Sequence, residues 1–263
     1  MIFDPSAAGT PSGDLSRKAL TDFFLGKKVH IVMDRPIGAE HPKHPGLIYP
    51  INYGYLPGVI SGDGEELDVY LLGVDVPVKE CDAVVIGVIH RTDDVEDKLV
   101  AAPEGKKFFQ HEIAQAVFFQ ERFHRGYVES VCEKSCGTVI FTVDGGVRKY
   151  LLIRSRNGVC GFPKGHMEPG EDERGTALRE TWEETSVRAE IVEGFRAETV
   201  YTMPNGKEKT VVYFLAGYSG GEPKHNPGFE DNEYLVLPYG EAYEALTHQN
   251  NKKILEQADR FQR

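Results

Sequence analysis

The chain has 263 residues, of which 30 are basic and 41 acidic, so its formal net charge at pH 7 is −11. This excess of negative charge argues against a general binder of nucleic acids or membrane surfaces, because phosphate backbones and anionic lipids attract Lys and Arg. It is compatible with a small polyphosphate substrate, since bound divalent cations reverse the local charge. No segment approaches the ~18 uninterrupted apolar residues of a membrane span, and residues 1–20 contain no signal-peptide core. A cytoplasmic protein is expected.

The cysteines do not have the spacing of a metal site. Cys132 and Cys136 are separated by three residues, and neither Cys81 nor Cys160 completes a second close pair. Reduced thiols are expected, as in most cytoplasmic proteins.

The first half of the chain alternates short apolar runs with turn residues. Residues 1–20, rich in Ser, Gly, Pro and Ala, are predicted to form a flexible arm. Strands are predicted over residues 29–33, 67–74 and 82–89, and a loop over 49–58. Residues 108–127 have the spacing of an amphipathic helix, with Ile113 and Val117 on one face.

The pattern restarts near Ser130, which predicts a second domain. Residues 136–155 form two β-runs joined by Asp144-Gly145-Gly146, a strong hairpin signal. A helix over residues 173–185, strands over 188–201 and 208–218, and helical spacing over 240–261 follow. We predict an arm over 1–20, a first domain over 21–128 and a second over 129–263.

Three glutamates share one face of the helix predicted over residues 173–185. Glu180, Glu183 and Glu184 stand at positions i, i+3 and i+4, where like charges repel by roughly 0.2–0.5 kcal/mol. A solvated acidic face is the usual explanation of such a run, but it leaves the repulsion unexplained. Clustered carboxylate oxygens suit Mg²⁺ or Mn²⁺, which also bind substrate phosphates. Trp182, four residues after Leu178, is expected in the core.

The same stretch resembles the Nudix box. Gly165, Glu171 and Arg179-Glu180 have the spacing of that motif, and Glu183-Glu184 with an apolar Val187 complete it. The resemblance implies an α/β/α sandwich around a mixed sheet. There are two departures. Thr181 replaces a bulky aliphatic residue, and Ser186 replaces the glycine that favours a left-handed helix end, so this turn is expected to be strained.

The resemblance implies Mg²⁺-dependent hydrolysis of a nucleoside diphosphate linked to another group, with Mn²⁺ as an alternative metal. The implied metal ligands are Glu180, Glu183 and Glu184. The implied catalytic residues are Glu183, Glu184, Arg179, Glu171 and Glu230. Arg179 and Glu171 would pair to hold the loop against the helix. Glu183, Glu184 and Glu230 are the candidates for the base that takes the proton of the attacking water.

Sequences flanking the box, within residues 134–262, are similar to asymmetrical diadenosine tetraphosphate hydrolases, which release ATP and AMP. That similarity implies phosphate contacts by Lys164, beside Gly165, and by Lys209, and base stacking on Tyr201. Tyr201 is almost equally well explained as an ordinary strand residue, and Lys209 as a solvated charge. Oxidised nucleoside triphosphates, nucleotide sugars and inositol pyrophosphates are the alternative substrates, because fold-level analogy is weak evidence for a substrate.

Residues 28–125 resemble a soluble inorganic pyrophosphatase, a β-barrel enzyme that uses several Mg²⁺ ions. The resemblance is strongest over residues 49–73. The positions that match the family's site are Tyr53, Asp63, Glu65, Asp68, Asp93 and Lys98, with Glu96 or Asp97 as a further acid.

The departures from the pyrophosphatase pattern predict a degenerate site. Glu65 replaces an Asp, and the segment before residue 49 is too short to hold the family's Lys, Glu and Arg, which leaves Arg35 and Lys43. A Tyr-Lys pair is replaced near Glu121. Three hypotheses follow: a Nudix hydrolase with an inactive barrel domain, a bifunctional enzyme acting on nucleoside triphosphates and pyrophosphate, or a nucleotide sensor without turnover. The barrel is also a candidate for homodimerisation.

Overall fold

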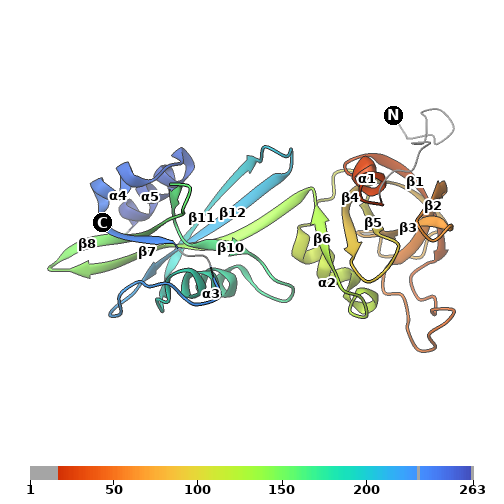
Figure 1. Ribbon diagram of the computed structural model, residues 1–263, viewed down its shortest axis with the longest axis horizontal. Helices are drawn as coiled ribbons and strands as arrows, with labels where there is room; N and C mark the ends of the chain where they lie inside the picture. Colours follow the sequence, from red (N-terminus) through yellow and green to blue (C-terminus); the bar gives the residue numbers. More distant parts are fainter. Residues whose placement is uncertain (1–16, 230–231, 262–263) are drawn as a thin grey trace. The chain divides into compact units, whose positions relative to one another are not determined.

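The computed structural model describes residues 17–229 and 232–261 (Figure 1). The chain divides into two compact units. The first extends to Glu133 and includes Pro204–Lys207, and the second comprises Lys134–Met203 and the chain from Glu208 onward. The arm predicted over residues 1–20 lies mostly outside the described residues, and its last four residues begin helix α1, Arg17–Phe24.

The first unit contains a closed five-stranded barrel. Its strands are β1 (Lys28–Arg35), β2 (Asn52–Ile60), β3 (Glu66–Leu71), β4 (Glu80–Arg91) and β5 (Lys98–Ala102). β1 pairs with both β2 and β4, which closes the order β1-β2-β3-β5-β4, and β6 (Gly126–Ser130) extends from β4. Strands β3 and β5 are parallel, and the other barrel pairs are antiparallel. The predicted mostly-β barrel is confirmed.

Two apolar clusters stabilise this unit. Side chains such as Ile31, Val69 and Leu99 form one cluster of buried residues contributed by the barrel strands. Helix α2 (Gln110–Glu121) contributes to the other, in which Ile113 and Val117 are fully or almost fully buried. The helix predicted over residues 108–127 is therefore present, over a shorter range, with the expected apolar face.

The loop prediction for residues 49–58 is wrong, because most of this segment belongs to β2. Gly54 lies opposite Met33 on β1, and a methyl group there would lie 2.0 Å from the carbonyl oxygen of Val32. Only glycine allows so close a strand pair. Pro57 falls where the pairing of β2 with β3 shifts register, a position in a strand that tolerates proline.

The second unit is a seven-stranded sheet between helices. Its strands are β7 (Cys132–Asp144), β8 (Val147–Arg154), β9 (Cys160–Gly161), β10 (Lys164–His166), β11 (Glu190–Thr202), β12 (Glu208–Gly217) and β13 (Glu233–Pro238). The main path has the order β11-β12-β7-β8-β13, with β10 paired to β7 and β9 to β8. Helix α3 (Glu173–Thr185) covers one face, and α4 (Tyr239–Ala245) and α5 (Gln249–Phe261) cover the other (Figure 1). The predicted α/β/α sandwich is confirmed.

The packing of α3 corrects one expectation. Ala177, Thr181 and Thr185, four residues apart, form its buried side. Trp182 is turned away from that side and is 43% exposed, so it is not a core residue. The hydroxyl of Thr181 lies 2.7 Å from both the Thr138 hydroxyl and the Ala177 carbonyl oxygen, which satisfies this polar group inside the core.

None of the four cysteines, all of which lie in the described part of the chain, forms a disulfide bond. Among the described helices, none combines the length and the apolar character needed to cross a membrane.

Candidate active site

The glutamate helix has defined ends. The carboxylate of Asp172 accepts a hydrogen bond of 2.7 Å from the backbone N–H of Gly175, which caps the N-terminus of α3. At the other end Ser186 has φ 56° and ψ 15°, the left-handed conformation that glycine favours. The turn expected from the Nudix box is therefore present with a non-glycine residue.

Arg179 connects the loop to the helix. Its Nε and Nη2 donate to the two oxygens of Glu171 at 2.6 and 2.8 Å, and Nη2 also donates to the carbonyl of His166 at 2.9 Å. Its Nη1 donates to Glu180 at 2.8 Å and to Glu183 at 2.9 Å. The hydrogen bonds from Arg179 lower the pKa of Glu171 to about 2. One guanidinium thus donates hydrogen bonds to three carboxylates. Because it carries a single positive charge, the cluster keeps an excess of negative charge.

Gly165 makes room for the first glutamate. A methyl group at this position would lie 2.1 Å from the carboxylate of Glu180, so any side chain would displace that carboxylate. Burial raises the pKa of Glu180 above its usual 4.5, against the opposing effect of Arg179. A cation beside this carboxylate would stabilise its ionised form.

Glu184 points in a different direction. Its Oε2 accepts a hydrogen bond of 2.8 Å from the backbone N–H of Lys164 on β10. Glu184 and Lys164 both line a cavity of about 600 Å³, whose walls also include Tyr201 and Tyr213. The helix therefore presents one carboxylate directly to a cavity large enough for a small-molecule ligand.

The predicted substrate residues divide into two groups. Lys164 and Tyr201 line the cavity, and Tyr201 is 40% exposed. Gly165 and Lys209 are not among the described lining residues. Lys209 is buried, and its Nζ lies 2.6 Å from His166 Nε2. Because an ammonium group can only donate, that imidazole nitrogen accepts the hydrogen bond. The expectation of a solvated Lys209 charge is therefore wrong.

The sequence interpretation missed a set of polar residues in the same cavity. His248 and residues 249–251, at the start of α5, line it together with Asn232. Asn232 is 8% exposed, and its Nδ2 has no hydrogen-bond partner among the described residues. No sequence signal marked these residues, because they come together only when α5 packs on the sheet. Glu230, the third candidate base, lies outside the described residues.

The glutamates of α3 fit a hard divalent cation by chemistry. They supply only oxygen donors, from one rigid helix, with more negative charge than Arg179 neutralises. Their carboxylates do not converge on one point, because Glu180 and Glu183 face Arg179 whereas Glu184 faces Lys164. Ligation of one metal ion by all three glutamates therefore requires some of these side chains to rotate.

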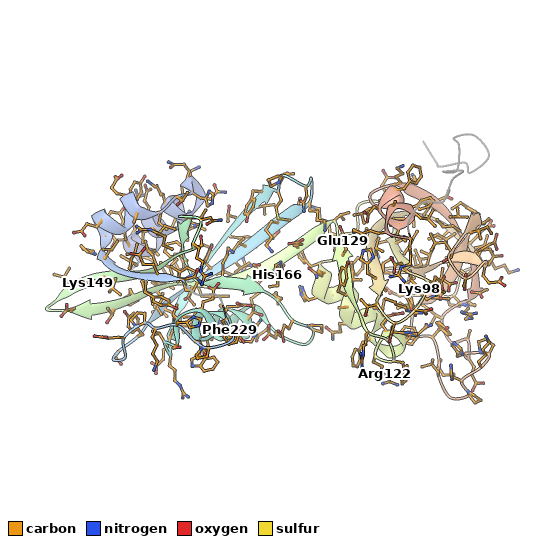
Figure 2. All side chains as sticks on the ribbon, viewed as in Figure 1. Lys98, Arg122, Glu129, Lys149, His166 and Phe229 are labelled. Carbon is orange, nitrogen blue, oxygen red and sulfur yellow. The ribbon has the colours of Figure 1, made fainter. Side chains whose placement is uncertain are left out.

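The barrel has its own charged cluster around Lys98, the residue labelled in the barrel unit in Figure 2. Its Nζ lies 2.5 Å from Asp68 and 2.7 Å from Glu96, and the Tyr53 hydroxyl donates to Asp68. The Lys98 side chain is 4% exposed. Glu96 Oε1 is buried without a hydrogen-bond partner among the described residues, and burial raises the pKa of this carboxyl. The structure thus places three of the six matched positions in one hydrogen-bonded cluster with Glu96. These three are Tyr53, Asp68 and Lys98.

The other matched positions lie apart from Lys98. Asp93 accepts a hydrogen bond of 2.8 Å from the backbone N–H of Arg125. Asp63 and Glu65 are exposed in the β2–β3 turn, where the Glu65 N–H donates to Asp63 at 3.0 Å. The expected site is only partly assembled.

In the segment that replaces the family's Tyr-Lys pair, the acid Glu121 is already neutralised by a buried base. Glu121 makes a bidentate pair with Arg91, at 2.6 and 2.8 Å, and accepts from Tyr70 at 2.5 Å. Arg91 is 4% exposed. This buried pair was not predicted, because its members are thirty residues apart in the sequence.

One further group in the described part of the first unit has the composition of a metal site. Ligand atoms of Asp22, His90 and Glu129 lie within 4.8 Å of one another. The ammonium of Lys18 lies 3.2 Å from Asp22 and 3.0 Å from Glu129, so a cationic side chain already neutralises these acids. The group therefore does not need a metal.

Comparison with known proteins separates the two units. The model of the NUDIX domain matches residues 135–258. An asymmetrical bis(5′-nucleosyl)-tetraphosphatase of Sus scrofa is 35% identical over 139 residues, covering 49% of this chain and 94% of that protein. A solved structure of an Ap4A hydrolase of C. elegans, a binary complex, has a TM-score of 0.46 at 26% identity and covers 49% of this chain and 97% of that one.

The first unit matches a different family. The model of inorganic pyrophosphatase matches residues 28–123. An inorganic pyrophosphatase of Mesorhizobium japonicum is 30% identical over 104 residues, which cover 32% of this chain and 59% of that protein. The chain therefore spans little more than half the length of this relative.

Proposed function

The chain belongs to the Nudix family and is a Nudix pyrophosphohydrolase, and from this membership we propose that it cleaves a dinucleoside tetraphosphate asymmetrically, with Mg²⁺. With diadenosine tetraphosphate the products are ATP and AMP. The proposal is supported by relatives at 34–35% identity that carry the name asymmetrical tetraphosphatase. The observation that carries it is the shared cavity of Glu184, Lys164 and Tyr201, where a carboxylate, a cation and an aromatic face meet.

The residues of this cavity have separable roles in the proposed reaction. Lys164 pairs with a phosphate oxygen, and Tyr201 offers a ring face on which a purine stacks. The backbone N–H of Lys164 orients Glu184 at the cavity wall. One of Glu183, Glu184 and Glu230 takes the proton of the attacking water.

Glu180, Glu183 and Glu184 are the residues that hold the metal. Nudix and pyrophosphatase enzymes depend on divalent ions, generally Mg²⁺, and the all-oxygen donor set suits that ion, or Mn²⁺. Bound Mg²⁺ lowers the pKa of a coordinated water and neutralises charge on the phosphates. Arg179 positions Glu180 and Glu183 and, through Glu171, fixes the loop that carries Gly165.

The barrel unit is, on this proposal, an inactive pyrophosphatase-like domain. Lys98, itself one of the positions matched to the family's site, is paired with Asp68 and Glu96. Arg91, a buried cation, is bound by Glu121. Asp93 is hydrogen-bonded elsewhere. The acids and bases of this unit therefore neutralise one another instead of facing a diphosphate.

The test is product analysis on diadenosine tetraphosphate with Mg²⁺, with inorganic pyrophosphate as a parallel substrate. We expect ATP and AMP from the first and no phosphate from the second. Phosphate released from pyrophosphate would support the bifunctional alternative. Tight binding of nucleotide without any product would support a sensor. Turnover of a nucleotide sugar in preference to diadenosine tetraphosphate would overturn the substrate proposal but leave the Nudix chemistry intact.

A further inference from the structure

The cavity of the Nudix unit has polar residues that the proposed reaction does not use. Lys164 and Glu184 are the charged side chains of its described lining, with His248 as a further titratable group. Five more lining residues carry uncharged carboxamides, and these are Asn157, Asn232, Gln249, Asn250 and Asn251. The charged part of the lining suits phosphate and metal. The carboxamides have no part in that chemistry.

Asn232 differs from the other carboxamides in its burial. It is 8% exposed, and its Nδ2 has no hydrogen-bond partner among the described residues, whereas Asn157 and Gln249 are exposed. A buried amide without a partner is destabilising, because it has given up its hydrogen bonds to water and gained none from the protein. An amide in this state that lines a ligand cavity can recover those bonds from the ligand.

The backbone beside Asn232 is held in place by the sheet. Asn232 comes immediately before β13, whose first residue, Glu233, lies opposite Arg154 on β8. The side chains of Glu233 and Arg154 also form an ion pair of 3.0 Å. Because strand pairing already positions this segment, little ordering of Asn232 is needed when a ligand binds.

The start of α5, which carries three of the other carboxamides, is fixed as well. The Thr247 hydroxyl accepts a hydrogen bond of 2.9 Å from the backbone N–H of Cys160, and the Thr247 N–H donates to the Cys160 carbonyl at 3.1 Å. A methyl group on Gly161 would lie 3.2 Å from Asn251 Nδ2, so this glycine makes room for the Asn251 side chain. The polar side of the cavity is therefore preformed.

The chemistry of a carboxamide suits the edge of a nucleobase. It offers one donor and one acceptor side by side, and adenine offers the complementary pair, its N6 amino group and a neighbouring ring nitrogen. Phosphate oxygens only accept hydrogen bonds, and Lys164 matches their charge better than an amide does. Tyr201 lines the same cavity and supplies a ring face on which a base stacks. Stacking on a ring and hydrogen bonding at an edge are the two contacts by which proteins recognise single bases.

We propose that Asn232 hydrogen-bonds the edge of the base in this cavity and selects adenine. The inference rests on the proposed function, which places one nucleoside of the substrate there. Nδ2 donates to a ring nitrogen of adenine while Oδ1 accepts from the N6 amino group. Guanine has a carbonyl oxygen in place of that amino group and an N–H in place of the ring nitrogen. The same amide orientation would then set donor against donor and acceptor against acceptor. Asn232 is thus a specificity-determining residue that takes no part in breaking the phosphoanhydride bond.

The experiment gives the full chain, with Mg²⁺, a mixed dinucleoside tetraphosphate that has adenosine at one end and guanosine at the other. Asymmetrical cleavage releases either ATP with GMP or GTP with AMP, depending on which base occupies the cavity. We expect the parent protein to favour one product pair roughly tenfold, the value of one bidentate pair. Asn232→Asp should favour the other pair, because a carboxylate accepts from two adjacent N–H donors of guanine. Both pairs come from one substrate, so their ratio does not depend on the amount of folded protein.

Asn205→Asp is the matched control, because it adds the same charge at a residue that does not line the cavity. The Asn205 Oδ1 accepts from the backbone N–H of Lys207 at 3.2 Å, a bond that aspartate keeps. This variant should retain the product ratio of the parent, whereas Asn232→Ala should release the two pairs in nearly equal amounts. Equal pairs from the parent, or a parental ratio in Asn232→Asp, would overturn the inference.

Binding measurements separate this inference from the proposed function. A parent protein that cleaves no dinucleoside tetraphosphate would contradict the proposed function alone, and the Kd values of AMP and GMP, measured by calorimetry, then carry the test. Tighter binding of AMP by the parent and of GMP by Asn232→Asp would support base recognition by Asn232. The same ratio of the two Kd values in both proteins would overturn it.

Discussion

The two units differ in how far basic side chains neutralise their clustered carboxylates. In the Nudix unit one partly exposed guanidinium, Arg179, contacts Glu171, Glu180 and Glu183, so the cluster keeps surplus negative charge. In the barrel unit the Lys98 ammonium is buried between Asp68 and Glu96. On the function proposed above, the Lys98 ammonium occupies the place of a free cation in the barrel cluster, whereas the surplus charge of the Nudix cluster suits a divalent metal. The comparison teaches that the net charge of an acidic cluster depends on where the nearest base lies as well as on the matching acidic residues.

The largest expected effect is a loss of catalytic activity on substitution in the Nudix unit. Glu184→Gln should lower kcat about 10³-fold, because it removes a metal ligand or the base at the cavity wall. Thermal unfolding should remain close to that of the parent protein. Glu193→Gln, at an exposed glutamate paired with Arg174, is the control and should keep full activity. Turnover of Glu184→Gln within threefold of the parent would remove Glu184 from the mechanism.

Substitution of Lys98 in the barrel cluster should lower the free energy of unfolding. Lys98→Met leaves Asp68 and Glu96 without their shared cation, and removing one partner of a buried pair costs about 3 kcal/mol of unfolding free energy. Urea unfolding followed by circular dichroism measures this loss, with exposed Lys79→Met as the control. If both variants unfold at the same urea concentration, Lys98 does not neutralise the cluster.

Gly165→Ala tests the packing beneath Glu180. The added methyl group displaces the Glu180 carboxylate, so we expect the Mg²⁺ concentration for half-maximal activity to rise and kcat/KM to fall roughly 10²-fold. Gly240→Ala is the matched control, because a methyl group there meets no atom within 4 Å. Unchanged metal dependence in Gly165→Ala would mean that Glu180 can move without consequence.

The smallest effect concerns the end of the glutamate helix. Residue 186 has the left-handed conformation, with φ 56°, which costs energy for any residue other than glycine. Ser186→Gly removes this cost and should raise the free energy of unfolding by roughly 1 kcal/mol. Ser186→Ala keeps the backbone cost and should bring no gain. A gain of equal size in both variants would show that the serine side chain, and not its backbone conformation, limits stability.

The sequence alone determined the features that depend on local spacing. The glutamates at i, i+3 and i+4 and the Asp144–Gly146 hairpin follow from helix or turn geometry. The left-handed position at Ser186 was implied by the resemblance to the Nudix box, which has glycine there. The Nudix and barrel folds followed from motifs that extend over many positions. The pairing of Arg179 with Glu171 was implied by the motif and is present, whereas its contacts to Glu180 and Glu183 were not foreseen.

Only the tertiary structure decided which distant side chains meet. Residues 49–58 form a strand because Gly54 allows β1 to approach closely, and Trp182 is exposed because α3 packs through Ala177 and Thr181. Lys209 is buried against His166, and Lys98 lies between two carboxylates. Such contacts depend on strand register and helix rotation, where small changes redirect a whole side chain, and spacing along the chain does not contain that information.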